Sequence, residues 1–177
     1  MGTVRLLAAL AALLAAFGTT LAQPLPGQRE AAEAGDPRAQ FAIALMYDTG
    51  ADVPTDYLEA LKWFRLSAEG GYPPGQAKLG LMYLFGWAVR RDPAEAASWY
   101  EKAASQGHER AQAQIGAMYA RGQGVPKNAV FAYLWTSLSA AAGNAESARK
   151  RDVLARKMTA DELAEAETLV RAWRPRR

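Results

Sequence analysis

The hydrophobic positions of this chain fall into two blocks within a unit of 36 residues, and the unit occurs three times. In the first block, apolar side chains recur at spacings of three and four residues, as at Ala39, Ile43 and Met46, which places them on one face of a helix. The second block follows the same spacing. The pattern therefore predicts two amphipathic helices in the first unit, near residues 37–48 and 56–69.

The three units align without insertion, so each column of the alignment holds the same kind of side chain at three places in the chain. The columns are Met46-Tyr47, Met82-Tyr83 and Met118-Tyr119; Gly50, Gly86 and Gly122; Val53, Val89 and Val125; Ala60, Ala96 and Ala132; Trp63, Trp99 and Trp135; Ala68, Ala104 and Ala140; and Gly71, Gly107 and Gly143. A period in the mid-thirties, with glycines closing two apolar blocks, is typical of helix pairs stacked into a solenoid. The fold class predicted is all-α.

Each second helix of a unit begins at a residue that can cap it. Asp56, Asp92 and Asn128 stand at this place, where a side-chain oxygen can accept from the free N–H groups of the first turn. A capping box at Thr159 and Glu162 likewise predicts the start of a final helix.

The loops inside the units differ from one another. Gly124 in the third loop can take positive φ, and Asp52 tolerates it, whereas Ala88 would be strained by about 1 kcal/mol in the same conformation. We therefore expect the middle loop to use a different turn, with Trp87 exposed.

The repeat register divides the chain into segments. They are a signal peptide (1–22), a linker rich in proline (23–28), an N-terminal capping half-repeat (29–35), three repeats (36–71, 72–107 and 108–143) and C-terminal capping helices (144–177). The signal peptide is predicted from a short n-region with one positive charge, an apolar run over 6–17 and small residues before the cleavage position. An uncleaved anchor is the competing interpretation, but the run is shorter than the roughly 20 residues that span a bilayer.

Composition excludes several kinds of chemistry. The formal charge of +3 is spread among interspersed acidic and basic residues, which argues against nucleic acid as a partner. The chain has no cysteine, so we expect no disulfide and no lipid anchor, and a protein without an integral membrane segment after signal cleavage. The only histidine, His108, lies in a turn between repeats, where a capping role accounts for it. We expect no catalytic residue, no metal site and no cofactor.

The motifs L/I-G/A-x-M-Y, G-x-x-V, A-x-x-W and A-A-x-x-G, repeated over 35–143, resemble the Sel-one-like repeat family. The resemblance implies a right-handed solenoid of antiparallel helix pairs related to tetratricopeptide repeats. It also implies an adaptor or regulatory role and, for bacterial members, export, which places the protein in the periplasm, or alternatively outside the cell. Some cysteine-rich exported relatives were proposed to bind or cleave β-lactams, but the paired cysteines are absent here.

A partner surface is expected where the repeats differ from one another. In tetratricopeptide-type solenoids the first helices line the concave face, and here they carry apolar residues with a few charges. The candidate groove residues are Phe41, Leu45, Asp48, Leu81, Leu84, Phe85, Trp87 and Arg121. The N-terminal linker or the C-terminal helix could cover part of this groove.

Three hypotheses of function follow. The first is an exported adaptor or regulator that binds a protein or peptide through the groove, as a monomer. The second is a protein that binds cell-wall fragments or a small molecule such as a β-lactam, with at most weak hydrolase activity. The third is a structural spacer.

Overall fold

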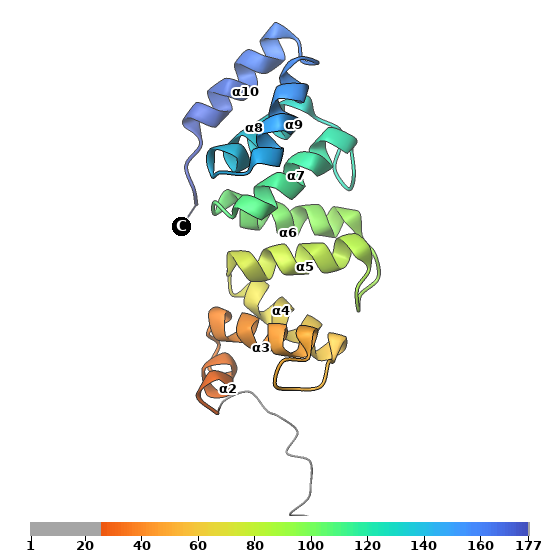
Figure 1. Cartoon of the computed structure of the whole chain (residues 1–177), viewed down its shortest axis with the longest axis vertical. Coiled ribbons are helices and arrows are strands. Elements are labelled where there is room, and N and C mark those ends of the chain that lie inside the picture. Colours follow the sequence, from red (N-terminus) through yellow and green to blue (C-terminus); the bar gives the residue numbers. More distant parts are fainter. Residues whose placement is uncertain (1–25, 177) are drawn as a thin grey trace, which may run out of the picture.

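The computed structural model describes residues 26–176, and over this range the chain is helical without any strand (Figure 1). The helices are α2 (Pro26–Glu33), α3 (Pro37–Thr49), α4 (Tyr57–Glu69), α5 (Pro73–Phe85), α6 (Pro93–Ser105), α7 (Glu109–Arg121), α8 (Ala129–Ala141), α9 (Ala145–Ala155) and α10 (Ala160–Ala172). The all-α class expected from the sequence is confirmed. The predicted signal peptide lies outside the described residues.

The helices are stacked along the long axis of the molecule, from α2 at one end to α10 at the other (Figure 1). Helix α3 packs on α4, α5 on α6, and α7 on α8, and each pair then packs on the next through α4 with α5 and α6 with α7. We call α3, α5 and α7 the first-helix row, which α9 continues by packing on α8, and we call α4, α6 and α8 the second-helix row.

Capping sets the start of each second helix as the sequence predicts. The carboxylates of Asp56 and Asp92 each accept from two backbone N–H groups of the first turn, and the Asn128 side chain accepts from the N–H of Phe131. At the other end of the chain, Thr159 and Glu162 form the complete capping box. Because these bonds satisfy groups that the helix itself leaves free, they fix where the helices begin.

The middle loop does not use a different turn, so that expectation is wrong. Ala88 has a φ of 54°, close to the 63° of Asp52 and the 74° of Gly124. The same backbone bond closes all three loops, here from the N–H of Asp92 to the carbonyl of Tyr83 at 2.8 Å. Ala88 is therefore held in the left-handed region at a cost of about 1 kcal/mol. Trp87 is exposed, as expected.

A buried glutamine fastens each helix pair to the helix before it. The side-chain amide of the glutamine donates to the carbonyl of an alanine eight residues earlier, and the bonds are Gln40 to Ala32 at 3.1 Å, Gln76 to Ala68 at 3.2 Å and Gln112 to Ala104 at 3.2 Å. Since Ala32 belongs to α2, this short helix occupies the place of a preceding second helix and covers the exposed end of the first pair.

The linker expected over residues 23–28 is partly wrong. Helix α2 begins at Pro26, so residues 26–28 are helical. The physical reason is that proline has a fixed φ suited to the first helical turn, where its missing N–H costs nothing. Residues 23–25 lie outside the described range.

The recurring aromatic residues are part of the scaffold. Trp63, Trp99 and Tyr83 are half-buried and pack against a cluster that includes Phe64 and Met82. The small positions next to them permit this packing, since a Cβ on Gly80 would lie 3.2 Å from the ring of Tyr100. These columns help to hold adjacent helix pairs together.

The C-terminal cap lies against the second-helix row. Helix α10 packs on α8, and the chain then returns toward the end of α6, where the N–H of Arg176 donates to the carbonyl of Ser105 at 2.8 Å. Trp173 and Arg176 line a hollow there together with Trp135. The C-terminal segment through Arg176 therefore leaves the first-helix row uncovered.

Candidate functional site

The first-helix row encloses a hollow of about 390 Å³, which we call the central hollow. It is lined by Phe41 and Leu45 from α3, Pro74, Ala77, Lys78 and Leu81 from α5, Tyr100 from α6, and His108, Arg110 and Gln114 from the start of α7. Three residues predicted from the sequence, Phe41, Leu45 and Leu81, are brought together here. Its volume lies within the range of about 300–1,000 Å³ that is common for ligand pockets.

Packing beneath the surface fixes one wall of the central hollow. The ring centroid of Phe41 lies 5.5 Å from that of Phe64 and 5.5 Å from that of Tyr72, so this ring is held from two sides. Leu45, one turn further along α3, keeps 37% of its surface exposed. Because its neighbours are packed in place, this apolar wall is preformed and does not need to be ordered by a partner.

Polar groups gather on the opposite side of the central hollow, around the start of α7. His108 caps α7 by accepting from the N–H of Ala111 at 3.2 Å through Nδ1, and burial lowers its pKa from the ordinary value of 6.5, with Arg110 adding to the effect. Arg110 is exposed and makes no ion pair with a described carboxylate. This side therefore presents a neutral imidazole next to a guanidinium that is available to a partner.

Tyr100 contributes a buried hydroxyl group to the same region. The residue is 2% exposed, and its hydroxyl oxygen has no hydrogen-bond partner among the described residues. Burial also raises the pKa of this hydroxyl, because the low-polarity surroundings disfavour the phenolate. An unpaired hydroxyl in such a place is costly, and it occurs here directly beneath a candidate binding surface.

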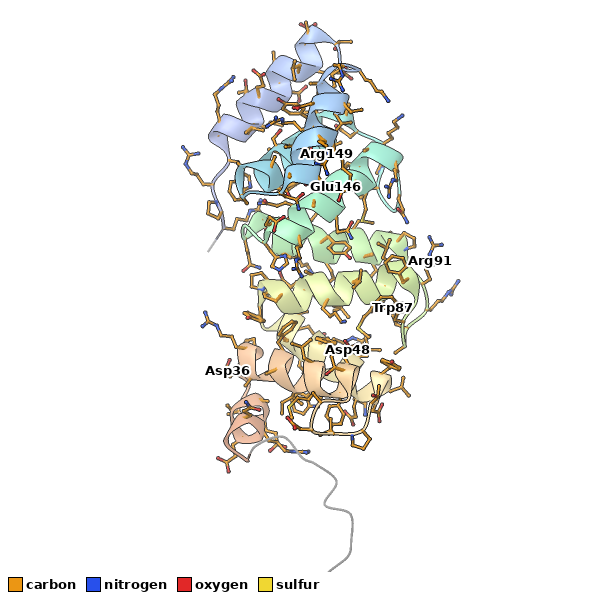
Figure 2. The ribbon with its side chains drawn as sticks, in the orientation of Figure 1. Asp36, Asp48, Trp87, Arg91, Glu146 and Arg149 are labelled. Atoms are coloured by element: carbon orange, nitrogen blue, oxygen red, sulfur yellow. The ribbon has the colours of Figure 1, made fainter. Side chains whose placement is uncertain are left out.

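A second hollow of about 560 Å³ adjoins the first and shares Lys78 with it. The Lys78 ammonium binds the carboxylate of Asp48 at 2.8 Å, with the two side chains 20% and 18% exposed, and lies 5.3 Å from the Phe64 ring centroid. Asp48 and Trp87, both predicted from the sequence, line this hollow (Figure 2). Since its charge is matched by Lys78, Asp48 helps to build the site and offers little charge of its own.

Two aromatic rings stand at the edge of this surface. Phe85 and Trp87 are 55% and 49% exposed and stack on each other, with ring centroids 5.3 Å apart and an angle of 20° between the planes. The Lys78 ammonium lies 5.9 Å from the Trp87 ring. Exposed, mutually supported aromatic rings are frequent anchors in protein interfaces.

Two predicted groove residues lie elsewhere. Leu84 is only 9% exposed and packs in the core with Ala97 and Ile115, so it supports the surface from below and does not form part of it. The reason is that an apolar side chain stands here where the first pair has Asp48: Leu84 joins a cluster with residues of α6 and α7, whereas Asp48 remains at a hollow. Arg121 lies at a separate hollow formed with α8 and α9.

Sequence reasoning missed most polar residues of the central hollow. Lys78, Arg110 and Gln114 were not among the predicted residues, and Tyr100 comes from the second-helix row. One signal could have found Tyr100: in its column the side chain changes from Phe64 to Tyr100 to Thr136, while the preceding column holds tryptophan in all three repeats.

Other kinds of site find no support within residues 26–176. No group of three or more His, Cys, Asp or Glu side chains is arranged there to hold a metal ion. No helix in that range is long and apolar enough to cross a membrane.

Comparisons with known proteins agree with the repeat architecture. Residues 37–72, 73–108 and 109–144 each match the family model of the Sel1 repeat. The structure is similar to that of a Sel1 repeat protein from Oxalobacter formigenes, with 38% sequence identity and a TM-score of 0.69, over 71% of this chain and 95% of the other.

Two further solved structures are similar. One is a protective antigen present in uropathogenic Escherichia coli strains that displays an SLR fold, with 28% identity and a TM-score of 0.65, over 82% of this chain but 39% of the antigen. The other is Helicobacter pylori cysteine rich protein B, which shares the fold at 19% identity and a TM-score of 0.57, over 74% of this chain and 96% of the other. No curated protein matches the sequence.

Proposed function

Because the chain belongs to the Sel1 repeat family, whose members are generally protein-interaction scaffolds, we propose that it binds a segment of a partner protein in the central hollow. The fold is typically non-catalytic, and we propose a binding role without chemistry. The observation that carries the proposal is the preformed apolar wall of Phe41, Leu45 and Leu81 facing the polar groups of Arg110 and Gln114 in one hollow.

The mode of binding follows from this arrangement. The apolar wall would take up one or two apolar side chains of the partner, and the opposite side would pair with its backbone or polar groups. The stacked rings of Phe85 and Trp87 would extend the contact beyond the hollow. Rigid walls lower the ordering cost of binding, so a short segment can bind usefully without a large interface.

Site-specific photo-crosslinking tests the proposal. A photoreactive phenylalanine analogue placed at Leu45, which is 37% exposed in the central hollow, is compared with the same analogue at Leu66, which is 44% exposed on α4 outside it. We expect a discrete crosslinked protein from position 45 only, and its loss when Leu81→Glu is added. Equal crosslinking from both positions, or crosslinking that survives Leu81→Glu, would contradict the proposal.

We also propose that the protein is exported and acts in the periplasm. The support is the predicted signal peptide over 1–22, which precedes the described repeats. Expression of the full chain and of a chain lacking 2–22, followed by cell fractionation, tests this. Recovery of the full chain in the cytoplasm, at its uncleaved mass, would refute export.

A further inference from the structure

A separate hollow of about 340 Å³ lies between α7 and α9, and we call it the α7–α9 hollow. The hollow arises at a repeat position where the third helix pair has a smaller side chain than the first two. The position beneath the first-helix row is filled by Phe64 in the first pair and Tyr100 in the second, but by the much smaller Thr136 in the third. Thr136 is 1% exposed and donates its hydroxyl to the carbonyl of Ala132 at 2.7 Å, so its polar atom is already paired.

The walls of the α7–α9 hollow are apolar. Ala117 and Ala120 of α7 form one side, and Val153 and Leu154 of α9 form the other. Val153 is 42% exposed, although it is an aliphatic residue on a helix that packs against the body of the protein. Apolar walls with a satisfied floor favour an apolar side chain over a polar one, since nothing inside could pair with a polar group.

The rim of the hollow carries positive charge. Glu146 binds Lys150 at 2.6 Å, and this hydrogen bond lowers the pKa of Glu146, so these two charges balance each other. Arg121 and Arg149 also line the hollow, and neither makes an ion pair with a carboxylate in the described part of the chain. Glu146 and Arg149 both extend from α9 (Figure 2). The rim is therefore left with two guanidinium groups.

We propose that the α7–α9 hollow binds a peptide segment in which a bulky apolar side chain is flanked by carboxylates. The apolar side chain fills the space that Thr136 leaves open, and the carboxylates pair with Arg121 and Arg149, whose planar donors suit a carboxylate well. The site is distinct from the central hollow, so this inference goes beyond the function proposed above and does not depend on it.

Fluorescence anisotropy with a labelled synthetic peptide tests the inference. The probe is a short peptide with one phenylalanine between two pairs of glutamates, and its counterpart carries lysines in place of the glutamates. With the mature chain we expect binding of the acidic peptide that weakens as salt rises from about 0.05 M to about 0.5 M, because salt screens the charges at the rim. The lysine peptide should not bind measurably.

Substitutions separate the contribution of the apolar walls to the peptide affinity from that of the two arginines. Thr136→Tyr introduces the larger side chain found at this position in the second pair. Ala120→Phe fills the hollow from its wall, and it provides a second test if the buried Thr136→Tyr variant does not fold. Each variant should lower the affinity for the acidic peptide at least about tenfold, as should the double variant Arg121→Gln with Arg149→Gln. Leu66→Glu, at an exposed position of α4 outside both hollows, should leave the affinity unchanged.

Several results of these binding assays would contradict the inference. Absence of binding up to about 1 mM acidic peptide, or equal binding of the acidic and lysine peptides, would overturn the inference. Undiminished binding by the folded Ala120→Phe variant would do the same. If laurate binds in a way that Ala120→Phe abolishes while the acidic peptide does not bind, the hollow takes a fatty acid and the peptide assignment is wrong.

Discussion

The unpaired hydroxyl of Tyr100 leads to a prediction whose sign is unusual. Tyr100→Phe removes one buried oxygen and keeps the ring, which is 2% exposed and occupies the same place as Phe64 in the preceding repeat. Leaving a buried polar group without a partner costs about 1–3 kcal/mol, and a neutral hydroxyl lies near the low end of that range. We therefore expect Tyr100→Phe to raise the free energy of unfolding by about 1 kcal/mol and the melting temperature by about 2–4 °C.

Urea denaturation followed by circular dichroism measures this change. A stabilised variant shifts the midpoint to higher urea at an unchanged slope, which shows that the compactness of the two states is preserved. Tyr119→Phe is the matched control, because the hydroxyl of Tyr119 donates to the carboxylate of Glu101. Its loss should lower the free energy of unfolding by about 1–2 kcal/mol. A lower midpoint for Tyr100→Phe would refute the reasoning, since it would show that the hydroxyl is paired in solution.

Three other predictions concern stability. Gln112→Ala should lower the free energy of unfolding by about 0.5–1.5 kcal/mol in the same urea assay, because it removes a buried hydrogen bond to the carbonyl of Ala104, which still accepts from the N–H of Gly107; an unchanged midpoint would show that the glutamine contributes nothing. Ala88→Gly should raise the melting temperature by relieving a residue held at a φ of 54°, and a lower melting temperature would mean that the loop is not strained. Burial lowers the pKa of His108 in the folded protein below 6.5, so that on acidification the imidazole is protonated first in the unfolded chain. The stability that is present above about pH 6.5 should therefore be lost as the pH falls through the pKa of the folded state. His108→Asn, which copies the cap formed by Asn144, should weaken this dependence, and an identical pH profile for both proteins would argue against it.

The repeat architecture could be predicted because the same local environment occurs three times. A capping residue such as Asp92 acts within its own first turn, so its role is visible in the sequence. The same holds for the glycines that close the helices and for the capping box at Thr159. Features that depend on neighbours within one or two turns were therefore predictable.

The candidate site was only partly predictable, because it depends on how different helices face one another. Helical spacing placed Leu84 on the groove, but the side chain is buried in a cluster with residues of α6 and α7. Lys78 and Arg110 become part of one hollow only when the fold brings α5 and the start of α7 to the same place. Ala88 shows a related effect, since a backbone bond between the two ends of the loop overrides the preference of the residue itself.

The return of the chain from α10 to the end of α6 has a consequence for cooperativity. In a solenoid each unit contacts only its neighbours, and unfolding can therefore begin at either end. Here the bond from Arg176 to Ser105 joins the last residues to the second repeat and spans the whole third repeat. The C-terminal half is thereby closed into a loop of contacts, whereas at the N-terminal end of the described residues the first repeat is covered by the short helix α2. Amide hydrogen exchange should consequently proceed inward from α2, with the third repeat among the last parts to open.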